Sequence, residues 1–324
     1  MARPRTHRPV PRDSSRRRPW VYLAVAAFII VDIILIALAL NSTRSDAPGA
    51  TPGAIRTFTS ISSSPTPTPT ATSQQRVAVS APPTRILAAL NATTAWRAIT
   101  GTCPETVASP ELTTDSGAHW KVTDVTGPTK VTSLQSIIVG SKSLASMVGL
   151  SKVDCTPELV KTFVAGDNYA SYPNELTGIW FVNPANRASV HSPTGDFAAP
   201  CTAVIALASR DTKAAAVLCA DQTVYQTTDA AAHWTQPATI PGAVNLSSTE
   251  SGYIASAVGQ TGCAGVQVIA LSAELRPGFT GCLPVDAAPT NLSGKVAMAE
   301  TAGTLWVWAA DVVKRSSDGG VSWQ

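Results

Sequence analysis

The sequence predicts an all-β fold, a β-propeller of about five four-stranded blades with six as the alternative, preceded by one transmembrane helix and a disordered linker. Three observations lead to this prediction. A turn motif recurs at intervals close to the length of one blade. Short β-prone segments separated by Gly, Pro, Asn and Asp lie between the motifs, without an apolar period of helical length. A 21-residue apolar run and a Ser/Thr/Pro-rich stretch precede them.

The first 40 residues have the pattern of a membrane anchor. Residues 1–19 carry seven of the chain's 24 basic residues and one of its 21 acidic residues, so the net charge of +3 comes from this tail. The run from Trp20 to Leu40 is long enough, as a helix, to cross a hydrocarbon core of about 30 Å. Arg16 to Arg18 immediately precede it, which places the N-terminus in the cytoplasm and the rest of the chain outside.

Two questions about this run stay open at the sequence level. A cleaved signal peptide is the alternative to an anchor, because Ala37-Leu38-Ala39 resembles a cleavage site, although the apolar run is longer than a usual signal core. Asp32 lies near the middle of the run, where it either faces a partner helix or is tolerated as one protonated carboxyl.

Residues 41–84 are dominated by Ser, Thr, Pro and Ala and hold few large apolar residues. Such a segment cannot bury a core, and a proline-rich chain serves as a semi-rigid spacer. We therefore expect a stalk that holds an ectodomain of residues 85–324 away from the membrane. No Lys/Arg block of the kind that binds nucleic acid is present there.

The recurring motif is Ser/Thr-x-Asp-x-Gly-x-x-Trp. Residues 113–120 and 316–323 match it completely, and residues 227–234 match it with Ala231 at the glycine position. Its hydroxyl and carboxylate can accept backbone N–H groups, glycine permits a left-handed backbone, and the tryptophan can bury its ring between sheets. The defining residues are Thr113, Asp115, Gly117, Trp120, Thr227, Asp229, Trp234, Ser316, Asp318, Gly320 and Trp323.

Two weaker copies complete the series. Residues 162–169 keep the threonine and glycine, and residues 272–279 keep the serine and have Glu274 at the aspartate position. The five aspartate positions are then separated by 49, 65, 45 and 44 residues. Three of these steps equal one blade of roughly 40–50 residues. The 65-residue step predicts either a blade with an insertion or a blade plus a fragment.

The motif resembles the Asp-box, or bacterial neuraminidase repeat, of sialidase-type and sortilin-type β-propellers. The resemblance implies a propeller over residues 85–324 in which the box residues stabilise peripheral turns. It carries over no catalytic residue, because Arg85-Ile86-Leu87 lacks the proline of the sialidase Arg-Ile/Leu-Pro motif and no tyrosine–glutamate pair stands out. His119 and His233, which precede two box tryptophans, are expected to share the structural role. The Ala/Thr/Pro-rich composition resembles that of actinobacterial envelope proteins.

One complete blade can be assigned strand by strand within residues 201–237. Its strands are expected at 202–208, 214–219, 224–227 and 234–236. The last box is followed at once by Gln324, so either residues 84–90 supply the outer strand of the last blade or that blade is incomplete.

The six cysteines all lie in the predicted ectodomain, and their even number in an oxidising compartment indicates three disulfides. The spacings suit no zinc site, and no metal site is expected. Pairing in chain order is predicted because two of the pairs bracket single hairpins. The predicted pairs are Cys103–Cys155, Cys201–Cys219 and Cys263–Cys282.

No catalytic residue, cofactor site or nucleic-acid partner is predicted. The sequence favours a single-pass cell-membrane protein whose ectodomain acts as a binding or scaffold module for an envelope protein or glycan. The alternative is an envelope glycoside hydrolase of sialidase-like fold, with carboxylates such as Asp167, Glu175 or Asp196. Convergence of carboxylates in the central cavity would favour the alternative, since glycosidase pairs sit roughly 5–9.5 Å apart.

Overall fold

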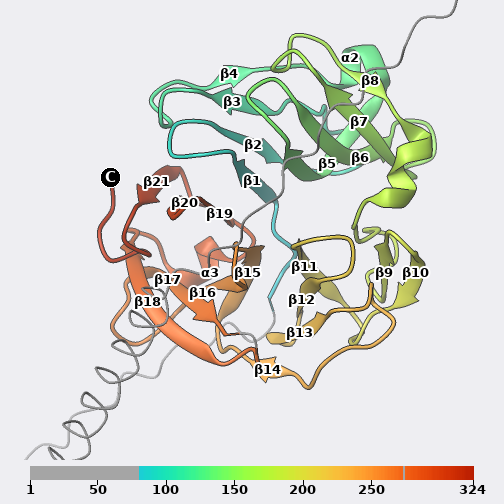
Figure 1. The fold of residues 1–324 in the computed structure, drawn as a ribbon. Coiled ribbons are helices and arrows are strands. Elements are labelled where there is room, and N and C mark those ends of the chain that lie inside the picture. The colour runs from blue at the N-terminus through green and yellow to red at the C-terminus, as the bar shows by residue number, and fades with distance from the viewer. Residues whose placement is uncertain (1–79, 273) are drawn as a thin grey trace, which may run out of the picture. The chain divides into compact units, whose positions relative to one another are not determined.

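The computed structural model describes residues 80–324 except Ala273, and they form an all-β, five-bladed propeller (Figure 1). The predicted tail, apolar span and most of the linker lie outside these residues, so the division of the chain into those parts stays a prediction. Within residues 80–324, leaving out 273, no helix combines the length and hydropathy needed to span a membrane.

Each blade is an antiparallel sheet whose strands follow one another in sequence. The first blade contains β1 (Arg85–Ala89), β2 (Ala95–Ile99), β3 (Glu111–Thr113) and β4 (Lys121–Val122). The second contains β5 (Val131–Val139), β6 (Ala145–Ser151), β7 (Pro157–Thr162) and β8 (Ala170–Ser171). The third contains β11 (Val204–Ser209), β12 (Ala215–Cys219), β13 (Thr223–Thr227) and β14 (Ala238–Thr239).

The remaining two blades follow the same order, with three strands in the fifth among the described residues. The fourth contains β15 (Ala243–Ser248), β16 (Tyr253–Val258), β17 (Gly265–Leu271) and β18 (Pro277–Pro284). The fifth contains β19 (Val296–Thr301), β20 (Thr304–Ala309) and β21 (Val312–Ser316). The short helices α2 (Thr126–Thr129) and α3 (Pro289–Leu292) connect blades.

An inserted unit, residues 173–199, accounts for the 65-residue step between two boxes. It contains the 3-10 helix η1 (Pro173–Gly178) and the hairpin of β9 (Ser189–Ser192) and β10 (Gly195–Ala198). Phe181 forms a β-bridge with His191, so a third chain segment runs beside the hairpin. Trp180 and Val190 pack against apolar residues of the third blade. The unit therefore lies between the second and third blades (Figure 1).

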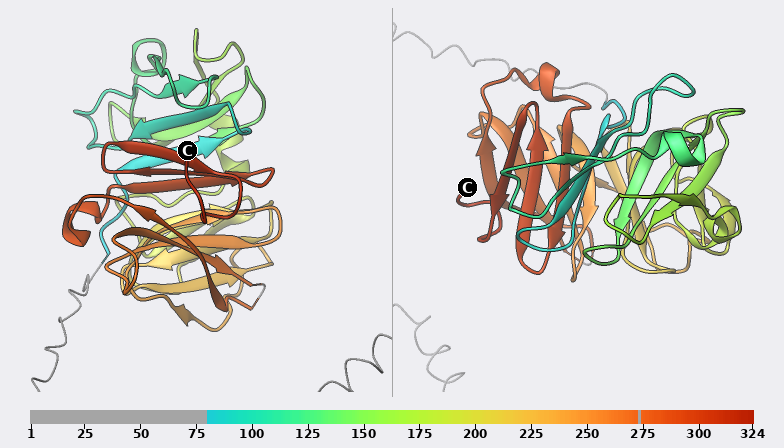
Figure 2. Two further views of the ribbon diagram at one scale, coloured as in Figure 1. Left: turned by 90° about the vertical axis from the view of Figure 1, so that its left-hand side faces the viewer. Right: turned by 90° about the horizontal axis from the view of Figure 1, so that it is seen from above.

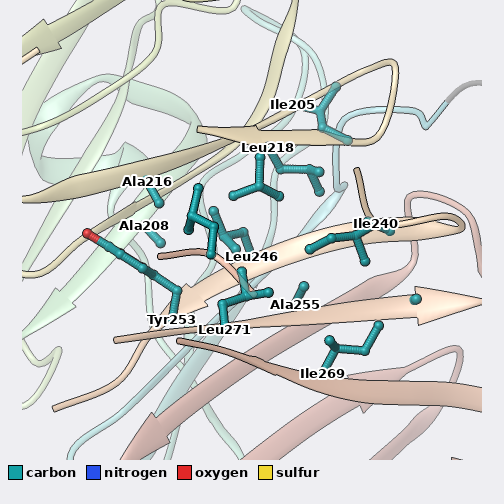
Figure 3. Close-up of a cluster of buried hydrophobic side chains, with 14 residues drawn as sticks. Ile205, Ala208, Ala216, Leu218, Ile240, Leu246, Tyr253, Ala255, Ile269 and Leu271 are labelled. Atoms are coloured by element: carbon teal, nitrogen blue, oxygen red, sulfur yellow. The ribbon is translucent and has the colours of Figure 1, made fainter. Parts of the chain in front are cut away.

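Neighbouring blades are held together by apolar side chains from facing sheets. Between the third and fourth blades, Leu218 and Ile205 pack with Leu246, Tyr253 and other buried residues of β15 to β17 (Figure 3). These side chains are nearly all buried, and burial of such aliphatic residues is the main favourable contribution to packing.

Of the two sequence-based alternatives for ring closure, the outer strand from residues 84–90 is wrong, whereas an incomplete last blade agrees with the three strands of the fifth sheet among the described residues. Residues 85–89 form β1, which pairs with β2 as the innermost strand of the first blade, and they add no outer strand to the fifth. The fifth blade instead packs on the first. The indole N–H of Trp306 donates to the Asn91 carbonyl at 3.1 Å, and the hydroxyl of Thr301 donates to the Leu90 carbonyl at 3.3 Å. Gln324 and Arg315 exchange two backbone hydrogen bonds where an outer strand begins.

Arginine and tryptophan side chains stack across this closure. The guanidinium carbon of Arg85 lies 4.5 Å from the ring centre of Trp308. That of Arg97 lies 5.0 Å from Trp308 and 4.1 Å from Trp120. Cation–π contacts of this kind contribute about 0.5–2 kcal/mol, depending on desolvation.

The assignment of the third blade was right for three strands and wrong for the fourth. Strands β11, β12 and β13 lie within about two residues of the expected ranges, but β14 begins at Ala238 and not at Trp234. Pro237 has no amide N–H to donate, and regular pairing begins after it. The Thr235 N–H still donates to the Gln226 carbonyl at 2.9 Å.

The ring has two distinct ends, visible from the side in Figure 2. The innermost strands begin at one end, where the Asn245 side chain of β15 donates to the Val296 carbonyl of β19. We call this end the strand-start face. The opposite end carries the turns after the innermost strands together with the box turns, because the N–H groups of Ser116 and Ala165 donate to the carbonyls of Thr93 and Ser143. We call it the turn face.

Candidate functional site

A cavity of about 360 Å³ occupies the centre of the propeller. Its wall is formed by the five innermost strands and by two stretches of the inserted unit, Trp180 to Val182 and Arg187. Its charged lining residues, within the described part of the chain, are Arg85, Arg187 and Glu300. The cavity therefore carries more positive than negative charge.

The two arginines lie toward the strand-start face. Arg85 is the first residue of β1, and the Arg187 carbonyl accepts the N–H of Val204, the first residue of β11. Glu300 lies near the end of β19, toward the turn face. An acidic group entering the cavity from the strand-start face would therefore meet the arginines first.

The two arginine side chains differ in the contacts that they make within the propeller. Arg85 stacks on Trp308 and lies 3.8 Å from Asp311, and burial lowers its pKa while the Asp311 charge opposes that shift. Arg187 donates one hydrogen bond to the Val204 carbonyl at 3.1 Å, and burial also lowers its pKa. A guanidinium has five N–H donors. Among the described residues, Nη1 of Arg85 is buried without a hydrogen-bond partner, so both arginines keep N–H donors for a ligand, and Arg187 has neither a ring contact nor an ion pair to the fold.

The three carboxylates considered for glycoside hydrolysis do not meet in the cavity. Asp196 pairs with His191, with 2.7 Å between its oxygen and the ring nitrogen. Asp167 pairs with Lys121, and Glu175 pairs with Lys161. None of the three is among the residues that line the cavity. The lining carboxylate Glu300 accepts the Gly303 N–H at 2.9 Å.

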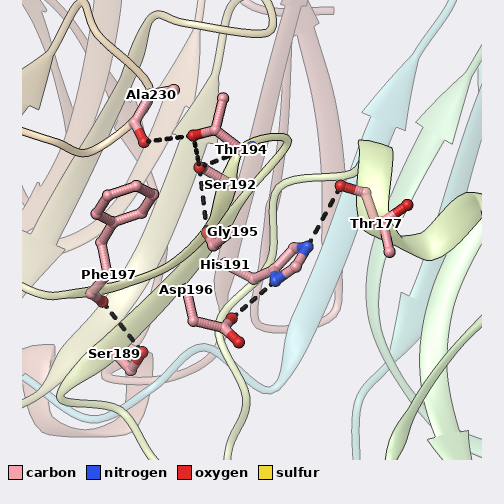
Figure 4. Close-up of polar contacts among 9 residues, drawn as sticks. All are labelled: Thr177, Ser189, His191, Ser192, Thr194, Gly195, Asp196, Phe197 and Ala230. Carbon is pink, nitrogen blue, oxygen red and sulfur yellow. Dashed lines mark hydrogen bonds and ion pairs between the residues drawn. The ribbon is translucent and has the colours of Figure 1, made fainter.

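His191 is a potential site residue that the sequence reasoning missed. Its Nδ1 lies 2.7 Å from an Asp196 oxygen, and its Nε2 lies 3.4 Å from the Thr177 carbonyl (Figure 4). Its ring stacks on that of Phe181, with 4.4 Å between the ring centres. Both ring nitrogens face acceptors, so this histidine does not activate a hydroxyl nucleophile. Its side chain is 14% exposed, against 75% for Asp196. The pair joins the hairpin to η1.

A sequence signal for this pair exists. Residues 193–195 read Pro-Thr-Gly, which is typical of a tight turn. A hairpin around that turn places residues 191 and 196 opposite each other, and the β9–β10 register shows that pairing. The singled-out Asp196 could therefore have been matched with His191 in advance.

All five box turns, including the two weaker copies, share one hydrogen-bond arrangement. The first hydroxyl accepts the N–H groups of the third and fifth residues. The bond to the fifth residue measures 2.9 Å at Thr113 and Thr162, 3.1 Å at Thr227, 3.2 Å at Ser272 and 2.8 Å at Ser316. The loss of aspartate or glycine from a copy therefore leaves the hydroxyl bonds in place.

The carboxylates of the three stronger boxes accept further hydrogen bonds within the turn. Asp115 and Asp229 each accept the N–H and approach the ring Nδ1 of the histidine four residues later. Asp318 accepts the N–H and hydroxyl of Ser322 in the same way. These hydrogen bonds lower the pKa of all three carboxyls to about 2. None of them lines the central cavity.

The box tryptophans are half-buried, which corrects the expectation of fully packed rings. The indole N–H of Trp120 donates to the Gly117 carbonyl at 3.1 Å, and that of Trp323 donates to the Cys282 carbonyl at 2.8 Å. Trp96 and Trp306, which lie outside the boxes, are fully buried. Each box tryptophan stands at the edge of its blade because it directly follows a turn.

All six cysteines form disulfides, in the chain-order pairs that the sequence predicted. Cys103–Cys155 joins a loop of the first blade to a loop of the second, whereas the other two pairs lie within single blades. Three disulfides indicate an extracytoplasmic domain, because such bonds persist in oxidising compartments.

No protein-family model matches the chain, and no similar protein was found among curated proteins. A structure of Ycf48 bound to a D1 peptide shares 13% identity and a TM-score of 0.39, over 77% of this chain and 81% of that one. An α-L-arabinofuranosidase from Clostridium thermocellum shares 9% identity and a TM-score of 0.42, over 76% and 93%. A xyloglucanase from Xanthomonas campestris shares 14% and 0.29, over 76% and 38%. Likenesses this low carry no functional argument, and the fold is assigned from the strands themselves.

Proposed function

We propose that this protein is a single-pass, membrane-anchored binding or scaffold module, whose extracytoplasmic propeller holds part of an envelope protein or glycan in its central cavity. The three disulfides support an extracytoplasmic location of the propeller. The 21-residue apolar run and the arginines before it support the anchor. The strand-start end of the cavity is the proposed binding site.

The charge of the cavity carries this proposal. Arg187 makes one hydrogen bond within the described chain, which leaves guanidinium donors for a ligand, while Glu300 already accepts a backbone N–H. A cavity of about 360 Å³ lies within the range of roughly 300–1,000 Å³ usual for ligand sites. An acidic or carbonyl-rich group of the partner fits this lining, because guanidinium groups bind carboxylates with paired hydrogen bonds.

The lining also favours binding over the glycosidase alternative. Hydrolysis of a glycosidic bond normally uses two carboxyl groups that flank the bond. Within the described chain the cavity presents Glu300, and the other candidate carboxylates pair with basic residues elsewhere.

The binding proposal is tested by capture of partners from an envelope extract. Arg187→Gln should reduce capture about tenfold, because a hydrogen bond to a charged group contributes about 1.5–3 kcal/mol. Ser247→Trp should abolish capture, because Ser247 lines the cavity and an indole there would occupy space that the ligand needs. Arg276→Gln is the matched control, since it removes the same charge from an exposed residue outside the cavity. Equal capture by all three variants would refute the proposed site.

The anchor is tested separately, by adding protease to intact spheroplasts. We expect loss of the ectodomain and retention of a small membrane-embedded fragment that contains residues 20–40. A soluble mature protein that begins near Leu40 would show that this segment is a cleaved signal.

A further inference from the structure

Residues 80–84, Ser-Ala-Pro-Pro-Thr, lie along the strand-start face before the chain enters β1, and we call them the strap. The first described residues of the chain can be followed across the middle of the ring in Figure 1. Ser80 donates its N–H to the Ala220 carbonyl of the third blade at 3.0 Å and its hydroxyl to the Ala243 carbonyl of the fourth. The strap thus begins at the boundary between those two blades.

The other end of the strap is fixed beside the fifth blade. The N–H and hydroxyl of Thr84 both donate to the Gly294 carbonyl, at 2.7 and 2.8 Å. The Thr84 carbonyl accepts the N–H of Thr100 in the first blade. Five residues therefore contact four of the five blades.

The sequence explains why this segment is a strap and not a strand. Pro82 and Pro83 have no amide N–H, so they cannot donate to a neighbouring strand. The hydrogen bonds are accordingly made by Ser80 and Thr84 at the two ends. Between them, Pro83 forms part of the wall of the central cavity.

We propose that the strap is an intramolecular gate on the central cavity, which a ligand entering from the strand-start face must displace. This inference rests on the proposed binding function of that cavity. Of the five strap residues Ser80 is buried, Pro82 and Pro83 are half-buried, and Ala81 and Thr84 are exposed, so no apolar side chain of the strap is fully buried. Segments held mainly by a few hydrogen bonds open locally at low free energy.

The gate is tested with a cysteine reporter in the full-length protein. Asn245→Cys places a thiol in the cavity wall, two residues after the Ala243 carbonyl that binds the strap. Its alkylation is timed with N-ethylmaleimide, which is small, and with a polyethylene-glycol maleimide, which is bulky. Combining the reporter with Ser80→Ala and Thr84→Val removes both strap hydroxyl bonds.

Opening of the strap should raise the rate of the bulky reagent about tenfold, as expected for the loss of two hydrogen bonds, and the rate of the small reagent about twofold or less. Thr301→Val is the matched control, because it removes a hydroxyl-to-carbonyl bond on the turn face. Equal acceleration of both reagents, or no acceleration of either, would overturn the gate.

Hydrogen exchange of the unsubstituted protein gives a second test that does not depend on how the variants fold. The Ser80 and Thr84 amides should exchange at least about tenfold faster than the paired amides of β1, because the strap opens without unfolding the blade. Equal protection would contradict the gate.

If Ser247→Trp abolishes partner capture while the strap variants leave alkylation unchanged, the gate fails and the binding site stands. If alkylation responds but Ser247→Trp leaves capture intact, the gate stands and the proposed function fails.

Discussion

The two faces of the ring are stabilised by different chemistry. On the strand-start face, covalent bonds link the loops, because every cysteine of the described chain lies in a loop or strand segment at that end. On the turn face, five turns are closed by hydrogen bonds to one serine or threonine hydroxyl each. One face therefore depends on oxidation and the other on local side-chain hydrogen bonds.

This difference bears on where function can reside. A box turn is specified by eight consecutive residues, and its hydroxyl and carboxylate accept their hydrogen bonds from within those eight residues. The strand-start face is built from residues far apart in sequence, including the arginines of the cavity wall and the strap. We expect the turn face to maintain the fold and the strand-start face to bind.

The largest effect should come from the disulfide that joins two blades. Cys103→Ser with Cys155→Ser opens a 52-residue loop, and the loop-entropy relation gives a loss of about 4 kcal/mol in the free energy of unfolding. The same relation gives about 3 kcal/mol for the 18- and 19-residue separations of the other two pairs. Chemical denaturation of the three double Cys→Ser variants measures the free energy of unfolding of each. A larger loss for either of the two short-range pairs would contradict the expected order.

On the turn face, Trp323→Ala should lower the free energy of unfolding by about 2–3 kcal/mol, less than the loss of a fully buried ring. Trp323 is half-buried and donates to the Cys282 carbonyl, so both packing and a hydrogen bond are lost. Trp323→Phe, which keeps most of the packing, should lower it by about 1 kcal/mol. If the two variants unfold at the same denaturant concentration, packing of the ring contributes nothing.

Acid should weaken the three box turns that carry an aspartate. The carboxyls of Asp115, Asp229 and Asp318 have pKa values lowered to about 2 in the folded protein, against about 3.9 in an unfolded chain. Their contribution is therefore complete above about pH 4 and is lost as the pH falls through about 2. The melting temperature should decline over this window, and the decline should be smaller in a variant with all three changed to Asn. An identical decline in that variant would assign the acid sensitivity to other groups.

The repeat predicted the number of blades because each box turn depends on eight consecutive residues and occurs once in each blade. The inserted unit could not be placed, since its position depends on Trp180 and Val190 packing against the third blade. For ring closure, the alternative in which residues 84–90 supply an outer strand was wrong, and the alternative of an incomplete last blade agrees with the three strands described there. Whether residues 85–89 form an inner or an outer strand is decided by pairing with β2 and packing on β19, which no short motif records. The cysteine pairs were predictable because two of them span hairpin-sized stretches.

The smallest effect is expected at the histidines of the boxes. His119 is 90% exposed, and Ser322 supplies the equivalent contact to Asp318 in the last box. His119→Ser should therefore change the melting temperature by about 1 °C or less. A clear destabilisation would show that the histidine ring has a role that a hydroxyl cannot replace.

The central claim, that the turn face maintains the fold while the strand-start face binds, is tested most directly by measuring stability and partner capture in the same two variants. Asp318→Ala should lower the melting temperature and leave capture per folded molecule unchanged. Arg187→Gln should reduce capture per folded molecule about tenfold, and any fall in its melting temperature should reflect only the lost hydrogen bond to the Val204 carbonyl. An Asp318→Ala protein that melts normally yet loses its partner would contradict the account, because the box carboxylate would then act in binding.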